Sequence, residues 1–247
     1  MPSRNQLEAA LLILRRKAAA SRALPLLGAG FGALLGFFWI RDSYDLAFRV
    51  FLFLYPYFFL FLSQDMFRDE IDSGSLENVL FVGGGFRDYL TWKLLLTAAA
   101  GLAAGLGAFA ILSACGLVTG PDAVTLSHLI RWLAGTAAGF YYLAVGGGLS
   151  FVFRAGSNVL VVILGQVALG TAFFISMTSR RAWVESLLSN DPRGTWGRLR
   201  FLGLTLLFPN AAVARPRIDL VAGLLLAGFA ILYLIRRKIR TLELGQR

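Results

Sequence analysis

The chain has 247 residues, of which 57% are hydrophobic and 15% are charged, and its mean hydropathy is +0.68. A soluble domain carries about 25% charged residues, so this composition excludes a soluble globule and indicates an integral membrane protein. The net charge is +10, but most lysines and arginines flank apolar runs, which is typical of anchoring at lipid headgroups rather than of nucleic-acid binding.

Residues 5–20 have the pattern of an amphipathic helix. Three leucines share one face at helical spacing, and the basic residues 15–17 follow them. The segment is too short and too charged to cross a membrane. We expect it to lie in the inner membrane interface, as part of an N-terminal unit of residues 1–22; a frayed cytosolic tail is the alternative.

Six long apolar runs follow, and each predicts a transmembrane helix. The runs are continuously apolar rather than alternating, and only helices then satisfy their own backbone polar groups within lipid. Most reach the ~20 residues needed to cross about 30 Å of hydrocarbon. Glycines recur every four residues in several runs, which lets helices approach closely. The predicted fold is an all-α membrane protein, with a six-helix domain over residues 23–235 and a basic cytoplasmic tail at residues 236–247. The predicted spans are residues 23–40, 46–63, 94–118, 133–153, 158–178 and 220–235.

The distribution of lysine and arginine predicts the orientation. With the N-terminus inside, 14 of the 24 basic residues lie on the cytosolic side, and seven of the other ten lie in one outer loop, residues 179–217. This asymmetry predicts that both termini are cytoplasmic. The outer loop mixes tryptophan and leucine with arginine, so we expect short helices that lie in or dip into the outer leaflet. An irregular solvated loop is the alternative.

The chain offers little catalytic or metal-binding chemistry. The last four predicted spans have no ionisable residue in their middle thirds, whereas ion-coupled carriers usually need one there. The glycines at 83–85 are not followed by the Lys and Ser or Thr of a phosphate-binding loop, so we expect no ATPase site in this chain. We expect His128, the single histidine, to be an interfacial side chain and Cys115, the single cysteine, to pack within a helix. No catalytic residue, cofactor or metal is predicted for the chain.

The second predicted span contains an unusual aromatic stretch, residues 51–62. Its proline predicts a kink that frees a backbone carbonyl, which a neighbouring helix or hydroxyl must satisfy. The aromatic side chains could line a path for an amphipathic substrate; the alternative is that they face lipid and pack the bundle. The candidate path residues are Phe51, Tyr55, Pro56 and Phe59, with Tyr141 and Tyr142 from the fourth span.

Residues 65–93, between the second and third spans, form a polar segment that contains six of the 14 acidic residues. We interpret Gly74 and Ser75 as a helix start, because the Ser75 hydroxyl can cap the following amides. Glu77 then lies in the first turn, where the helix dipole favours an acid. A small apolar face follows, and the glycines at 83–85 end the helix. The pattern predicts a short helix beneath the membrane, joined to two longer ones.

At these residues the chain resembles the permease subunits of ABC-2 type exporters. In that family the second span is followed by Glu, three residues, Gly-Thr-Leu-Glu, two leucines, a proline, an arginine and a lysine before the third span. Gly83 stands where the family usually has proline. The specific match covers about 25 residues, and the predicted architecture of the remainder is similar to that of the family. The positions that match with the same spacing are Glu70, Gly74, Ser75, Leu76, Glu77, Val79, Leu80, Arg87 and Lys93.

This resemblance implies that residues 65–93 carry a cytoplasmic coupling helix, which contacts a separate ATP-binding cassette subunit that binds ATP and Mg²⁺. It also implies a second permease copy or a related permease, and a location in the bacterial cytoplasmic (inner) membrane. The chain is then a transport subunit rather than an enzyme, and it exports an apolar or amphipathic substrate by alternating access. The coupling residues implied are Arg68, Glu70, Gly74, Ser75, Leu76, Glu77, Leu80 and Arg87.

Three alternatives stay open. Within the family, residues 67–80 are also similar to the haem-exporter permease of cytochrome c maturation. Outside it, the chain could be an ion-coupled secondary carrier or channel, or a membrane-embedded enzyme or assembly factor.

Overall fold

Among the residues that the computed structural model describes, all regular structure is helical and no strand occurs. Three helices in this described part are long and apolar enough to cross a membrane, at Tyr44–Leu62, Thr91–Val118 and Ile218–Arg237. For the described residues, the prediction of a helical fold with helices able to cross a membrane is therefore confirmed. The described residues are 8, 11–12, 15, 28–34, 36, 43–63, 66–67, 86–119, 124–153, 157–179, 202–214 and 216–245.

Helix α3 (Tyr44–Leu62) lies at the centre of the described core. Its N-terminus is capped by Ser43, whose hydroxyl accepts a hydrogen bond from the amide of Leu46 at 3.4 Å. The helix begins two residues before the predicted second span, because this cap and the acidic Asp45 in the first turn favour an earlier start.

The chain remains helical through Pro56, although proline has no N–H to donate to the carbonyl of Leu52. The side-chain amide of Asn210, 157 residues further along the chain, donates to the carbonyl of the adjacent Phe53 at 3.0 Å. A polar side chain from a distant segment therefore reaches the turn that the proline weakens.

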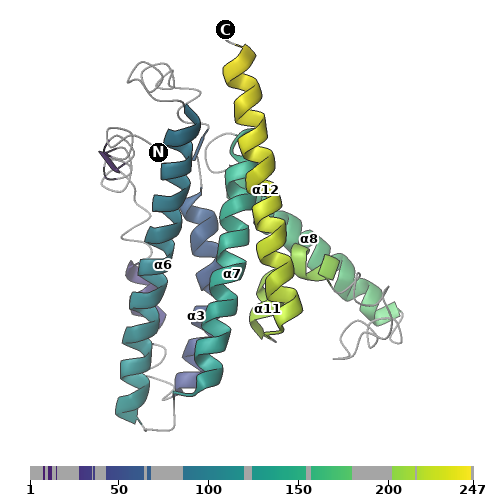
Figure 1. The fold of residues 1–247 in the computed structure, drawn as a ribbon. Coiled ribbons are helices and arrows are strands. Elements are labelled where there is room, and N and C mark those ends of the chain that lie inside the picture. Colours follow the sequence, from purple (N-terminus) through teal and green to yellow (C-terminus); the bar gives the residue numbers. More distant parts are fainter. Residues whose placement is uncertain are drawn as a thin grey trace.

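Helices α6 (Phe86–Thr119) and α7 (Leu126–Leu149) both pack against α3. In Figure 1, α6 runs antiparallel to α3 and α7, which run in the same direction. Helix α6 begins eight residues before the predicted third span. The last residues of the polar segment 65–93 are therefore the first turns of this long helix.

Glycines on α6 and α7 receive the aromatic rings of α3. A Cβ atom at Gly105 would lie 2.1 Å from the Tyr55 ring, and one at Gly139 would lie 2.3 Å from the Phe59 ring. Gly101 on α6 faces the same Phe59 ring, at 2.5 Å. The glycines therefore create space that rings fill, so these helices are held together by ring-into-glycine packing.

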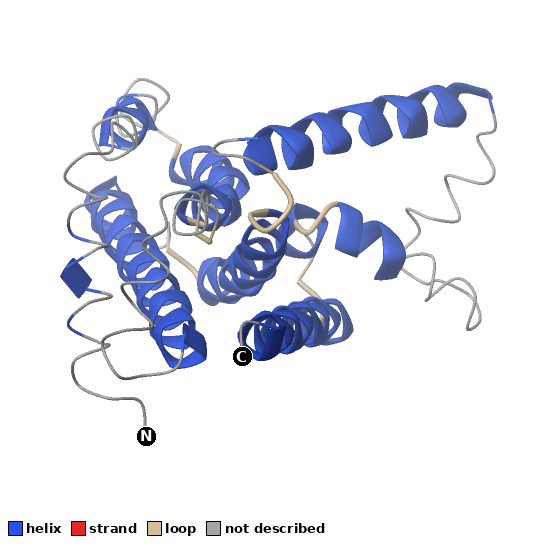
Figure 2. Ribbon diagram, turned by 90° about the horizontal axis from the view of Figure 1, so that it is seen from above, coloured by secondary structure: helices blue, strands red, loops and turns tan. Residues whose placement is uncertain are grey.

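The remaining helices differ in how closely they join this core. Helix α12 (Ile218–Gly245) packs along α7 and continues ten residues beyond the predicted sixth span, so most of the expected basic tail is helical. Helix α8 (Ser157–Ser179) has few contacts with α7 and extends away from the other helices, as Figures 1 and 2 both show.

The chain between α8 and α12 returns to the core. Residues 202–207 are helical, and the short helix α11 (Asn210–Ala214) packs against α7 and α3 with Ala212 and Val213 buried. The short helices expected in this loop are thus present in its described part. Their depth in the outer leaflet stays a prediction.

Candidate functional site

The aromatic stretch of α3 has two faces. Phe51, Tyr55 and Phe59 are at most 6% exposed and pack into the bundle, whereas Phe53 and Phe61 are 57% and 45% exposed. This division follows from helical geometry, because residues four apart share one face of a helix. These three candidate path residues are therefore buried within the bundle, and whether any of them contacts a substrate stays a prediction.

A cavity of about 490 Å³ lies between residues 30–34, α3 and α6. Phe51 and Tyr55 line it from α3, and Ala108 and Ile111 line it from α6. None of the residues that line it is charged. Its volume is within the range of about 300–1,000 Å³ that is usual for small-molecule sites, and its apolar lining suits an apolar ligand.

The other candidate path residues lie elsewhere. The Phe59 ring fills the space beside Gly101 and Gly139 and does not line this cavity, nor does Pro56. Tyr141 and Tyr142 lie on α7: the backbone of Tyr141 is close to α12, and Tyr142 is buried in a small cluster with Leu60 and Val159. The six residues are therefore not brought together around one cavity.

A polar network that sequence analysis missed connects four segments of the chain. The hydroxyl of Tyr57 donates to the side-chain carbonyl of Gln166 at 2.7 Å. The Gln166 amide in turn donates to the hydroxyl of Tyr142 at 2.7 Å and to the carbonyl of Leu207 at 2.9 Å. Gln166 is the only glutamine in the predicted fifth span. An amide within an apolar span needs partners, and this signal could have identified it.

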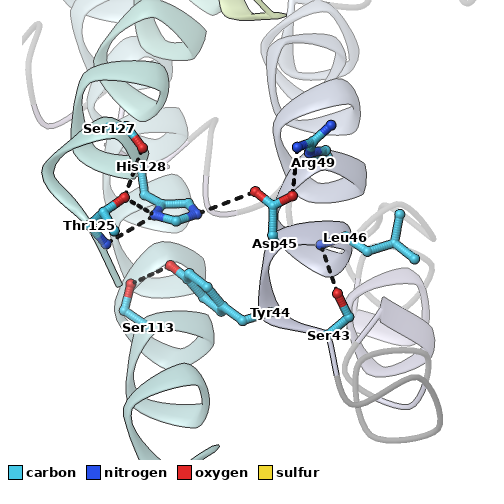
Figure 3. A network of polar contacts seen from close by, with 9 residues as sticks. All are labelled: Ser43, Tyr44, Asp45, Leu46, Arg49, Ser113, Thr125, Ser127 and His128. Atoms are coloured by element: carbon cyan, nitrogen blue, oxygen red, sulfur yellow. Dashed lines mark hydrogen bonds and ion pairs between the residues drawn. The ribbon is translucent and has the colours of Figure 1, made fainter. Parts of the chain in front are cut away.

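A second polar cluster lies where α3 and α7 begin (Figure 3). The Nδ1 atom of His128 accepts a hydrogen bond from the amide of Thr125 at 3.1 Å, and its Nε2 lies 3.7 Å from Asp45. His128 is only 5% exposed and packs against the rings of Tyr44 and Phe48. The side chain that we expected at the membrane interface is thus buried between α7 and two rings of α3.

Burial lowers the pKa of His128 below its ordinary value of 6.5, and the nearby carboxylate of Asp45 opposes this shift. The imidazole is therefore mainly neutral at pH 7. No group of three or more His, Cys, Asp or Glu side chains that could hold a metal ion occurs in the described part of the chain. The cluster joins the starts of α3 and α7, and the chain has no second histidine that could bind a metal ion together with His128.

Most of the coupling residues implied by the family resemblance lie outside the described residues. Arg68, Glu70, Gly74, Ser75, Leu76, Glu77 and Leu80 belong to this group. The backbone of Arg87 is part of the first turn of α6, and its side chain is not described. The structure therefore describes the two ends of the polar segment and not its centre.

These two ends are joined to each other. The ammonium group of Lys93 on α6 donates a hydrogen bond to the carbonyl of Met66, just beyond the end of α3. Lys93 is 2% exposed, and its ammonium lies 5.9 Å from the centre of the Tyr89 ring. Next to Met66, the Phe67 ring stacks on Phe151 with 4.6 Å between ring centres. The Lys93–Met66 hydrogen bond, which we call the closed base, thus joins the two ends of the polar segment. The sequence position of Lys93 at the edge of a span did not indicate this contact.

Comparison of the chain with protein-family models, with curated proteins and with solved structures finds no match.

Proposed function

We propose that the chain is the transmembrane permease subunit of an ATP-driven exporter of the ABC-2 type, and that it moves an apolar or amphipathic substrate. A separate cytosolic ATP-binding cassette subunit supplies the energy, and a second permease copy or a related permease completes the path. The chain has six spans in a bacterial cytoplasmic membrane, with both termini in the cytoplasm. The alternating directions of α3, α6 and α7, and the direction of α12 parallel to α7, agree with this topology (Figure 1).

The observation that carries the proposal is the closed base of the segment that contains the motif. Residues 68–85 are bracketed by Met66 and Lys93, which are hydrogen-bonded to each other. Because Lys93 is buried and belongs to α6, while Met66 closely follows α3, a force on this segment acts on both helices together. Such a connection is what a coupling element requires.

The same two helices form walls of the apolar cavity. Helix α3 contributes Phe51 and Tyr55, and α6 contributes Ala108 and Ile111. A displacement of α3 and α6 relative to the rest of the bundle therefore changes the shape of the cavity. In alternating access, one group of helices rocks against another around a fixed site. ATP binding at the cytosolic subunits would drive this movement through residues 68–85.

The proposal is tested by charge reversal at the motif and by crosslinking. We expect a cysteine at position 77 to crosslink to a co-purified ATP-binding protein. We expect Glu77→Lys to reduce substrate-stimulated ATP hydrolysis at least about tenfold, because reversing a charge at an interface creates repulsion with the partner. The matched control is Glu185→Lys in the predicted outer loop, which is expected to leave hydrolysis unchanged.

Lys93→Met tests the mechanical step separately. This variant is expected to keep the ATP-binding subunit and to lose transport per ATP hydrolysed, since α6 is no longer joined to the end of α3 by this hydrogen bond. If no ATP-binding protein associates even under crosslinking, or if Glu77→Lys leaves hydrolysis unchanged, the proposal fails. Transport that needs an ion gradient and no ATPase would instead identify the chain as an ion-coupled carrier.

A further inference from the structure

A second and smaller pocket, of about 240 Å³, lies between α3, α7 and α11. Its basic residues are Arg49 from α3 and Arg131 from α7, and Asn210 of α11 adds an amide. Apolar side chains, among them Leu52 and Val213, complete the walls. None of the coupling residues lines the pocket, so its ligand does not depend on the coupling proposal.

The two arginines in the pocket are not equally neutralised. Arg49 forms an ion pair with Asp45 at 2.7 Å, four residues earlier on the same helix. Arg131 is partly buried, and it forms no ion pair or hydrogen bond within the described part of the chain. His128 also contacts Asp45, at 3.7 Å, and α11 has no charged residue. Two guanidinium groups thus line the pocket and only that of Arg49 is paired with a carboxylate, so the described residues of the pocket carry an excess positive charge.

Asn210 adds an atom that needs a hydrogen-bond donor, whereas the two arginines need acceptors. Its amide nitrogen donates to the Phe53 carbonyl at 3.0 Å, which fixes the orientation of the side chain. Its side-chain oxygen is buried and has no hydrogen-bond partner. A buried acceptor without a donor is unfavourable. Asn210 also lines the pocket, so a ligand with anionic oxygens and one hydrogen-bond donor matches the kinds of polar group in its lining.

The depth of the pocket agrees with the headgroup layer of a membrane. Arg49 and Arg131 each lie five residues after the first residue of their helices. At 1.5 Å per residue this is about 7.5 Å along each helix, close to the polar layer of one leaflet, which is about 5–7 Å thick. Leu52 lies almost one turn further along α3 and is buried, so the pocket passes from a charged to an apolar side.

We propose that this pocket binds a phosphate group that carries a neighbouring hydroxyl or ammonium donor, as in a phospholipid headgroup or a soluble phosphate compound. The guanidinium groups bind the phosphate oxygens, because arginine presents several donors in a planar arrangement that matches phosphate geometry. The donor on the ligand bonds the free oxygen of Asn210.

The test measures binding of three probes to the purified full chain in detergent. The probes are dioctanoyl phosphatidylglycerol, the phosphate-free dioctanoylglycerol, and inorganic phosphate as a competitor. We expect the phospholipid to bind and the phosphate-free lipid not to bind. Competition by inorganic phosphate at equal concentration assigns the site to soluble phosphates, and the absence of such competition assigns it to the lipid headgroup.

Variants identify the pocket as the site. Arg131→Gln is expected to weaken phospholipid binding about tenfold, the equivalent of one charge-assisted hydrogen bond. Arg237→Gln, an exposed arginine of α12, is the matched control and should bind as the natural chain does. Asp45→Asn removes the competing carboxylate and should strengthen binding severalfold, which gives a result even if Arg131→Gln does not fold. Equal binding by all these variants, or equal binding of the phosphate-free lipid, would overturn the proposal.

Discussion

The ring-into-glycine packing predicts a specific cost for adding one methyl group to α6. In Gly105→Ala, the new Cβ would lie 2.1–2.3 Å from the ring and hydroxyl of Tyr55, so the ring must move. Overpacking of this kind costs about 1–3 kcal/mol. Replacing a helical glycine by alanine gains about 1 kcal/mol of helix propensity. We therefore expect the free energy of unfolding to change by between about zero and −2 kcal/mol.

Gly107→Ala is the internal control for this prediction. Gly107 lies on the same helix two residues later, and a Cβ atom added there would meet nothing within 4 Å. It gains the same helix propensity, so the free energies of unfolding of the two variants should differ by about 1–3 kcal/mol. The assay is denaturant or thermal unfolding of the purified chain in detergent.

A second variant isolates the contact itself. Tyr55→Leu makes room beside Gly105, so Gly105→Ala should cost less in that background than in the natural chain. Equal stability of Gly105→Ala and Gly107→Ala, or the same cost with and without the Tyr55 ring, would refute the packing argument.

Two further predictions concern the polar clusters. Gln166→Leu should lower the free energy of unfolding by about 1–2 kcal/mol, since three hydrogen bonds are lost at about 0.6 kcal/mol each. Hydrogen exchange should show reduced protection of residues 159–171, and unchanged protection would contradict this role of Gln166. The folded-state pKa of His128 is lowered by burial, so the unfolded chain binds the proton more tightly and stability should fall as the pH drops below about 6.5. His128→Gln should reduce the difference between unfolding midpoints at pH 7.5 and pH 5.5, and an unchanged difference would contradict this assignment.

Some features of the core could be predicted from a single stretch of sequence. The helical periodicity that divides the aromatic stretch into buried and exposed faces is a property of α3 alone. The start of α6 could not be predicted in this way. The sequence position of Lys93 indicates the membrane edge, yet its side chain is buried in a hydrogen bond to Met66, 27 residues away. A charged side chain of this kind is placed by a partner that its own sequence neighbourhood does not contain.

The candidate site shows the same limit. The residues Phe51, Tyr55, Phe59, Tyr141 and Tyr142 have the same aromatic character in sequence. In the structure Phe51 and Tyr55 line a cavity, the Phe59 ring fills the space beside two glycines, Tyr141 is close to α12, and Tyr142 belongs to a cluster near α8. What separates them is the pairing of helices, which brings the glycines of α6 and α7 beside particular rings and the amide of Gln166 beside two tyrosines.

A helical fold with segments able to cross a membrane could be inferred from the sequence alone, because hydropathy and the need to satisfy backbone polar groups in lipid act on each segment separately. It also contains the motif at Glu70 to Lys93 on which the transport proposal depends. Which groups meet became visible only in the folded chain: the closed base at Lys93, the apolar cavity and the two-arginine pocket. These arise from contacts between residues far apart in the chain, and such contacts depend on how complete helices pack against one another.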